Sequence, residues 1–216
     1  MDMDLDRVNG YKGKSLRSFN RLAKHYDSSY IGRQAHGGYG SVLDRLSTFP
    51  YRAVLDVGCG TGAVLSMIPR RPGVRLCGVD LAPEMIEVAQ ARLGSDVELK
   101  VGDSEHLPWP DSSFDCVICT FSFHHYPQPE KVLSEMYRVL RDGGHVIIAD
   151  PWAPAPARQI VNLILRFGLG ADGDVRVYDR QDLVTLMDQA GFIGVLWQAL
   201  GVSTWIASAT VDRQAA

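Results

Sequence analysis

Three aspartates stand at the ends of three successive apolar runs in the first half of the chain. Asp56 lies within the first run, Asp80 closes the second, and Asp103 comes two residues after the third. Apolar runs of this length predict strands, and the carboxyl ends of neighbouring parallel strands meet at one edge of a sheet. A rim of carboxylates at that edge would attract a cationic ligand or accept hydrogen bonds from hydroxyl groups.

A glycine-rich turn, Gly58-Cys59-Gly60-Thr61-Gly62, directly follows the first of these strands. Glycine allows positive φ angles and close approach of a ligand to the backbone. The helix expected after the turn offers free N–H groups and a partial positive charge at its N-terminus. Asp80 follows at the spacing of one strand–helix–strand unit, where a carboxylate can accept both ribose hydroxyls of an adenosine. The turn and Asp80 together predict a site for an adenosine-containing cofactor.

Two classes of cofactor compete for this site. Gly58, Gly60 and Ala63 also fit the GxGxxA pattern of dinucleotide-binding proteins, so a nicotinamide-dependent oxidoreductase is an alternative. Asp56 argues against it, because an ionised carboxylate two residues before Gly58 would repel a pyrophosphate. S-adenosylmethionine has no phosphate, and Asp56 would attract its ammonium and sulfonium groups directly or through water. A purely structural role, in which Asp56 caps the following helix, leaves Asp80 and Asp103 unexplained.

Strand-like and helix-like segments alternate along the chain, which is typical of an α/β fold. Strands are expected at 53–57, 74–80, 97–101, 115–120, 145–150, 193–200 and 204–211. Helices are expected at 15–26, before Pro50, and at 63–68, 83–93, 129–140, 157–167 and 179–190, with Gly143 and Gly144 ending the helix 129–140. The last two strands have no helix between them and should pair antiparallel. The prediction is a doubly wound, Rossmann-like sheet of seven strands, mostly parallel with an antiparallel last strand.

Residues 52–150 resemble the class I S-adenosylmethionine-dependent methyltransferases. Within that class, the segments 102–115 (GDSEHLPWPDSSFD) and 137–144 (YRVLRDGG) are similar to the branch that contains the quinone-biosynthetic C-methyltransferases. Asp142 stands where this family usually has proline, which is a change in a loop. The resemblance implies S-adenosylmethionine as cofactor and S-adenosylhomocysteine as product. It also implies a methyltransferase domain at 50–216, preceded by an N-terminal helical lid at 1–49.

The resemblance also implies which residues hold the cofactor. Asp56 and the glycine turn would line its methionine part, Asp80 would hold the ribose, and Asp103 would accept the adenine amino group. Leu81 and Met85 would pack beside the adenine, or belong to the hydrophobic core. Tyr26 would close over the methionine end, or belong to the apolar stripe of the first helix. The full set of implied cofactor contacts is Tyr26, Asp56, Gly58, Cys59, Gly60, Thr61, Gly62, Asp80, Leu81, Met85, Asp103, Ser104 and Thr120, with Thr120 below the sulfonium.

A pair of histidines, His124 and His125, follows the fourth strand, near the place where the methyl group should point. Methyl transfer from a sulfonium is an in-line displacement, so a catalytic base is optional. A histidine there would either remove a proton from the acceptor or shape its pocket. Asp150, at the end of the fifth strand, would face the same cavity or form a turn. Aromatic residues that could build an apolar acceptor pocket are Phe121, Phe123, Tyr126, Trp152 and Phe167.

Composition narrows the classes of partner. The chain of 216 residues suits one domain, and its net charge of -3 gives no basic field for nucleic acid or anionic lipid. The segment Thr120-Phe121-Ser122-Phe123 also lacks the motif with which amino-methylating DNA enzymes hold a flipped base. No apolar segment is long enough to span a bilayer. A small-molecule acceptor is therefore expected, with no nucleic-acid partner and no membrane insertion. The sequence carries no signal for an oligomeric state.

The four cysteines are expected to be buried thiols. Cys116 and Cys119 have CxxC spacing, but they lie on one strand and should point to opposite faces of the sheet. No metal site is therefore expected. Unpaired cysteines and the absence of a secretory signal favour the cytoplasm. A non-catalytic, regulatory S-adenosylmethionine-binding protein would carry the same cofactor motifs and remains an alternative to the enzyme.

Overall fold

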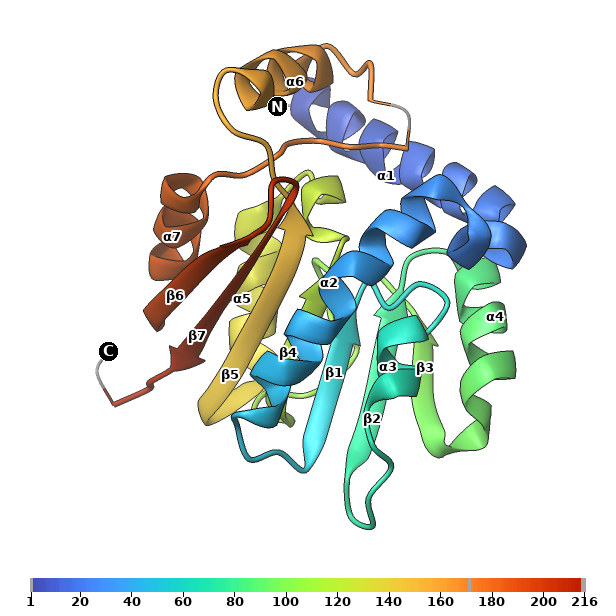
Figure 1. The fold of residues 1–216 in the computed structure, drawn as a ribbon, viewed down its shortest axis with the longest axis vertical. Helices are drawn as coiled ribbons and strands as arrows, with labels where there is room; N and C mark the ends of the chain where they lie inside the picture. The colour runs from blue at the N-terminus through green and yellow to red at the C-terminus, as the bar shows by residue number, and fades with distance from the viewer. Residues whose placement is uncertain (1, 171, 215–216) are drawn as a thin grey trace.

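A twisted seven-stranded sheet runs through the centre of the molecule (Figure 1). The computed structural model describes residues 2–170 and 172–214. The strands lie in the order β3-β2-β1-β4-β5-β7-β6, and β7 runs opposite in direction to the other six. Their bounds are β1 Ala53–Val57, β2 Arg75–Asp80, β3 Val97–Val101, β4 Phe114–Thr120, β5 Leu140–Pro151, β6 Phe192–Leu200 and β7 Thr204–Val211. The predicted sheet, including the antiparallel end, is confirmed.

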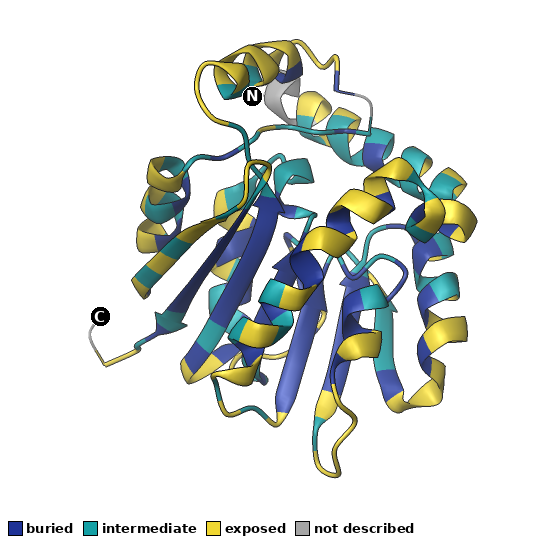
Figure 2. Cartoon of the chain, viewed as in Figure 1, coloured by how far each residue is buried: buried dark blue, intermediate teal, exposed yellow. Residues whose placement is uncertain are grey.

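Helices cover both faces of this sheet. One face carries α2 Tyr30–Ser47, α3 Ala63–Met67 and α4 Pro83–Leu93, and the other carries α5 Pro129–Val139 and α7 Arg180–Gln189. Two hydrophobic cores result, one on each side of the strands (Figure 2). Cys116 belongs to one core and Cys119 to the other, and all four cysteines are buried and free. The expectation that the CxxC pair points to opposite faces is confirmed.

Local sequence signals set several element boundaries. All five residues of β1 are buried, because a central parallel strand is covered on both faces. Pro83 occupies the first turn of α4, where its missing N–H is not needed. The Asp179 side chain accepts a hydrogen bond of 2.8 Å from the backbone N–H of Asp182 and caps α7. These boundaries agree with the prediction.

Two boundaries differ from the prediction. The first helix, α1 Asp2–Leu22, begins well before residue 15 and continues into a 3₁₀ helix at Ala23–Ser28. On the other side of the sheet, α5 ends at Val139 and β5 begins at once, so the two glycines expected to end the helix lie inside β5. The cause is that Leu140 already pairs with Phe114 of β4, which pulls the chain into the sheet before the glycines are reached.

Helix α6 Ala157–Arg166 lies at the rim of the molecule beside the N-terminal half of α1 (Figure 1). The Tyr11 hydroxyl of α1 donates to the backbone oxygen of Leu165 at 3.1 Å. The segment that follows α6 is also tied to α1, because the Ser15 hydroxyl donates to the backbone oxygen of Asp172 at 3.0 Å. Among the described residues, no helix combines the length and hydrophobicity that crossing a bilayer requires.

Candidate functional site

Two adjoining cavities open where the strand order reverses, at the carboxyl ends of β1 and β4. In an open α/β sheet this switch point is where ligands bind. The first cavity has about 510 Å³ of empty volume and the second about 520 Å³. They share Phe19, Gly58, Asp80, Ser122 and His125, so one extended ligand could occupy both.

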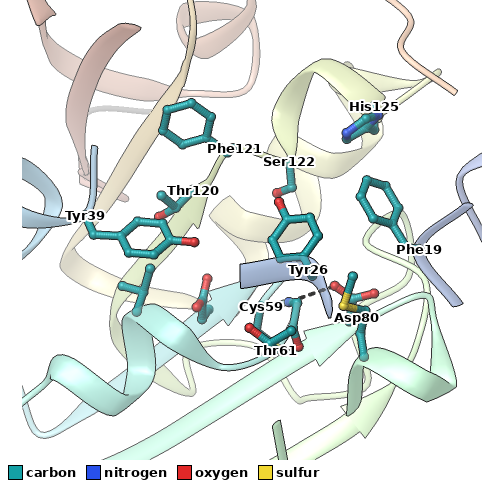
Figure 3. A pocket seen from close by; sticks show the side chains of 15 residues that line it. Phe19, Tyr26, Tyr39, Cys59, Thr61, Asp80, Thr120, Phe121, Ser122 and His125 are labelled. Carbon is teal, nitrogen blue, oxygen red and sulfur yellow. Dashed lines mark hydrogen bonds between the residues drawn. The ribbon is translucent and has the colours of Figure 1, made fainter. Parts of the chain in front are cut away.

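The first cavity brings together most of the predicted site residues (Figure 3). Those that line it are Tyr26, Asp56, Gly58, Cys59, Gly60, Thr61, Asp80, Met85, Thr120 and His125. Phe121, expected in an aromatic acceptor pocket, also lies in this wall. Sequence reasoning did not identify the remaining residues of the wall, which are Phe19, Tyr39, Val64 and Ser122. Three of these four lie on α1, α2 and α3, outside the motifs, and only their place in the fold brings them here.

The second cavity holds the remaining predicted contacts of an adenosine, namely Leu81, Asp103 and Ser104 beside Asp80. A lysine of α1 closes one side of it. Lys12 Nζ lies 2.7 Å from Asp103 Oδ2 and 2.7 Å from Glu105 Oε2. The other oxygen of Asp103 accepts a hydrogen bond from the backbone N–H of Glu105 at 3.0 Å. Sequence reasoning missed Lys12, because nothing near it in the sequence resembles a motif.

Some predicted residues lie outside both cavities. Gly62 begins α3 with a φ of 73°, and an added Cβ would stand 2.7 Å from Leu93 Cδ1, so it serves the packing of α3 on α4. His124 lies behind His125 and lines neither cavity. Three members of the predicted aromatic pocket lie outside both cavities. Phe123 is fully buried in the core, Trp152 packs against the same core, and Phe167 is 72% exposed at the end of α6.

The glycine turn is held by hydrogen bonds within the protein. The N–H groups of Gly58 and Cys59 donate to the backbone oxygen of Val79 at 2.9 and 3.0 Å. The N–H of Gly60 donates to Asp80 Oδ2 at 2.9 Å, the bond drawn in Figure 3. The N–H groups of these three residues are therefore not free to bind a ligand, whereas the expectation from the sequence concerned the start of α3. A pyrophosphate would find few donors here, whereas a ligand without phosphate does not need them.

Close approach to the turn depends on Gly58. Its φ is 73°, and an added Cβ would stand 2.4 Å from the Ser122 hydroxyl and 2.9 Å from the Tyr126 hydroxyl. Ser122 and Tyr126 are fixed in turn, because the Ser122 hydroxyl donates to the backbone oxygen of Val57 at 3.1 Å and lies 2.9 Å from the Tyr126 hydroxyl. Any side chain at position 58 would therefore displace this polar group from the wall of the cavities.

The first cavity has the electrostatic character of a cation site. Asp56 is 1% exposed, and its Oδ1 has no hydrogen-bond partner among the described residues. Burial, followed by the charge of Asp80, raises the pKa of Asp56 to about 8. The Thr120 hydroxyl, in the wall of the same cavity, is also buried and has no hydrogen-bond partner in the described part of the chain. A buried carboxyl in this state is stabilised by a cationic ligand, and the ammonium and sulfonium of S-adenosylmethionine fit that requirement.

The histidine pair joins two aspartates beside the cavities. His124 Nδ1 lies 2.9 Å from Asp150 Oδ1 and His124 Nε2 lies 3.7 Å from Asp174 Oδ1. The same oxygen of Asp174 lies 3.2 Å from His125 Nδ1, although that atom completes no hydrogen bond among the described residues. Asp174 comes from the loop after α6 and was not predicted. His124, His125 and Asp174 offer ligand atoms within 4.8 Å of one another.

The two imidazoles differ in charge. Burial opposes the charged form of His124, but the carboxylates of Asp150 and Asp174 outweigh it and raise the pKa of His124. Burial, and then the charge of His124, lowers the pKa of His125 well below its ordinary value. His125, which faces both cavities, is therefore a neutral imidazole near neutral pH, and His124 behind it holds a proton more readily than His125 does.

Comparison with known proteins agrees with this geometry. A family model described as a methyltransferase domain matches residues 55–148. The demethylmenaquinone methyltransferase of Deinococcus radiodurans is 35% identical over 119 residues, 53% of this chain and 48% of that protein. The demethylmenaquinone methyltransferase of Thermotoga maritima is 32% identical over 153 residues, 68% of this chain and 66% of that protein. The chain spans only about half the length of several of these relatives.

A solved structure shares the fold over almost its whole length. It is the complex between the Haloferax volcanii Trm112 methyltransferase activator and a methyltransferase, with a TM-score of 0.75 and 19% identity. The match covers 90% of this chain and 98% of that chain. On the sheet topology and these similarities, the chain belongs to the class I S-adenosylmethionine-dependent methyltransferases and is similar to the branch that contains the demethylmenaquinone methyltransferases.

Proposed function

We propose that the chain catalyses transfer of the methyl group of S-adenosylmethionine to a small molecule. The observation that carries this proposal is the buried Asp56, which faces the first cavity with one oxygen unpartnered among the described residues. A ligand with positively charged groups offsets the cost of burying this carboxylate, whereas a pyrophosphate adds to it. When bound, S-adenosylmethionine supplies both the cationic groups and an activated methyl group.

In this proposal, different parts of the cofactor bind in the two cavities. Asp56, the turn 58–62 and Thr120 hold the methionine and sulfonium end in the first cavity. Asp80, which lines both cavities, accepts the ribose hydroxyls with the oxygen lone pairs that its backbone hydrogen bonds leave free. The adenine lies in the second cavity, with Asp103 accepting from its amino group. Leu81, Met85 and the Ser104 backbone complete its surroundings.

We also propose that residues 1–49 act as a lid on the domain formed by residues 50–216. Several of its contacts support this role. Lys12, Phe19 and Tyr26 contribute to the walls of the cavities. Thr61 of the glycine turn donates to Asp27 at 2.8 Å, and Arg92 of α4 forms an ion pair with the same carboxylate. A segment tied to both the turn and α4 is well placed to exclude water from the reaction.

The acceptor side is proposed to lie next to His125, between Phe19 and Phe121. The His125 imidazole, neutral near pH 7, can accept a hydrogen bond or a proton from the acceptor. His124 would position it from behind. The aromatic walls favour an apolar or aromatic acceptor, and the relatives named for demethylmenaquinone support a small organic one. The four buried free thiols support a reducing, cytoplasmic setting.

The test is a turnover assay that detects S-adenosylhomocysteine. The purified protein would be incubated with methyl-labelled S-adenosylmethionine and a panel of phenols, carbon acids, amines and thiols. We expect product formation that depends on one acceptor class, and loss of that turnover in Asp56→Asn. Normal binding of S-adenosylhomocysteine without turnover on any acceptor would instead favour the non-catalytic, regulatory alternative.

A further inference from the structure

Helix α6 turns its apolar side outward. Ile160, Leu163, Ile164 and Phe167 follow one another at the spacing i, i+3, i+4, i+7, which places them on one stripe of the helix. All four are exposed, with Phe167 at 72% and Ile160 at 58%. Leu169, just beyond the helix, is 70% exposed and extends this outward stripe. Figure 2 shows α6 as an exposed element at the rim of the molecule.

The inward side of α6 is fixed mainly by polar contacts. The Asn162 side chain donates to the backbone oxygen of Val177 at 3.0 Å and accepts from the Val177 N–H at 2.8 Å. Arg158 pairs with Asp179 at 2.8 Å, and only Leu165 is a buried apolar residue of the helix. The usual amphipathic arrangement, apolar inside and polar outside, is therefore reversed. A helix built this way presents its apolar stripe to something outside the described residues.

The charge around the stripe points to the kind of surface it contacts. The chain has a net charge of -3, yet residues 151–171 contain two arginines and no acidic residue. Arg158 is paired inward with Asp179, so the exposed Arg166 is the basic residue of the helix that stands beside the stripe. Arg7 of α1 stands beside the end of the stripe, donating to the backbone oxygen of Arg166 at 3.2 Å. Asp6, next to Arg7 in the sequence, keeps this positive field small. An apolar stripe with basic flanks is typical of helices that lie in a membrane interface.

We infer that α6 docks on the surface of an anionic phospholipid membrane, with the stripe from Ile160 to Leu169 in the headgroup region. A second copy of the chain is a poorer occupant for two reasons. A ten-residue helix is only about 15 Å long, too short for a stable dimer interface of roughly 1,200 Å² or more. A two-fold contact would also bring the arginines of both copies together without an acid from 151–171 to pair with them.

This docking surface is continuous with the acceptor side of the cavities. The loop after α6 carries Asp172, which is bonded to Ser15 and Ser18 of α1, and Asp174, which faces His125. Contact of α6 with a lipid surface would therefore affect the position of the loop after α6, and with it the cavity wall beside His125. The inference rests on the exposed stripe and not on methyl transfer, so the two can fail independently.

The test is binding of the full chain to vesicles of phosphatidylcholine alone and of phosphatidylcholine with phosphatidylglycerol in equimolar amounts. We expect sedimentation with both, stronger by a few-fold on the anionic vesicles and weakened by salt. Phe167→Ser and Ile164→Ser should each lower the partition coefficient by about tenfold. The matched control is Leu196→Ser on β6, which removes a side chain that is also exposed, at 64%. S-adenosylhomocysteine affinity, measured for every variant, checks the fold.

A labelled variant locates the contact. Since the native cysteines are all buried, an environment-sensitive dye on Phe167→Cys should report the lipid without interference. Its emission should shift to the blue on anionic vesicles, and the same dye on Leu196→Cys should not respond. Failure to bind vesicles, or equal binding by wild type and Phe167→Ser, would overturn the inference. Concentration-dependent dimerisation abolished by Phe167→Ser would assign the stripe to a second copy instead.

Discussion

Binding of the cofactor is expected to release a proton from Asp56. In the cofactor-free protein, burial and then the charge of Asp80 raise the pKa of Asp56 to about 8. The Asp56 carboxyl is then about nine-tenths protonated at pH 7. A ligand ammonium placed against it would favour the charged carboxylate and lower this pKa. The bound protein therefore holds fewer protons than the free protein, and affinity should rise with pH.

The size of the effect follows from that pKa. Saturation with S-adenosylhomocysteine at pH 7 should release about 0.9 proton per chain if the bound pKa falls well below 6. Under the same condition the dissociation constant should fall nearly tenfold between pH 6 and pH 7. The ligand's own α-amino group stays protonated in this range. Calorimetry in two buffers that differ in ionisation enthalpy measures the proton release directly.

The matched variant is Asp56→Asn, which keeps the shape of the side chain and cannot titrate. It should bind S-adenosylhomocysteine more weakly, release almost no proton at pH 7 and show little change in affinity between pH 6 and pH 7. An affinity of the wild type that falls as pH rises would refute the reasoning. So would undiminished proton release in the variant, because another group would then be the source.

Three further predictions concern single residues. Asp80→Ala removes the acceptor for two ribose hydroxyls, so calorimetry should find at least about tenfold weaker cofactor binding, and an unchanged constant would place the ribose elsewhere. His124→Ala and His125→Ala should leave S-adenosylhomocysteine affinity nearly unchanged while lowering turnover; a large drop in affinity with an intact fold would move these histidines into the cofactor site. Because the pKa of Asp56 is raised on folding, its contribution to stability is complete below its ordinary pKa and is lost as pH rises to about 8. The melting temperature of cofactor-free Asp56→Asn, relative to that of the wild type, should therefore rise between pH 5 and pH 8. A difference in melting temperature that stays constant over this range would contradict the raised pKa.

Much of the fold could be predicted because local signals were strong and mutually consistent. The buried run of β1 and the proline at the start of α4 fixed those elements with little error. The capping Asp179 did the same for α7. The junction between α5 and β5 was less accessible, since the pairing of Leu140 with Phe114 is a tertiary contact that overrides the glycine signal three residues later.

The residues of the candidate site also fall into a predictable and an unpredictable group. Asp56, Asp80 and the glycine turn lie on consecutive strand ends, so their meeting at one edge follows from the sheet alone. Lys12 reaches the second cavity from α1, and Asp174 reaches the histidine pair from the loop after α6. No period or motif in the sequence indicates where those segments fold back. Sequence therefore predicts the part of the site built by the sheet and misses the part built by the segments packed over it.

Hydrogen bonding within the glycine turn shows a further limit. The sequence predicted free N–H groups at the start of the following helix, but it did not indicate that Gly58, Cys59 and Gly60 donate to Val79 and Asp80. These hydrogen bonds depend on the register of β1 against β2. The outcome strengthens the case against a phosphate ligand on grounds that the sequence did not contain.

The most direct test of the account is to titrate the purified chain with S-adenosylmethionine, S-adenosylhomocysteine and NAD in separate calorimetric experiments. Because the buried Asp56 favours a cationic ligand, we expect saturable binding of S-adenosylmethionine and S-adenosylhomocysteine at one site per chain, and no binding of NAD. Tight binding of NAD, with neither S-adenosylmethionine nor S-adenosylhomocysteine bound, would contradict the account.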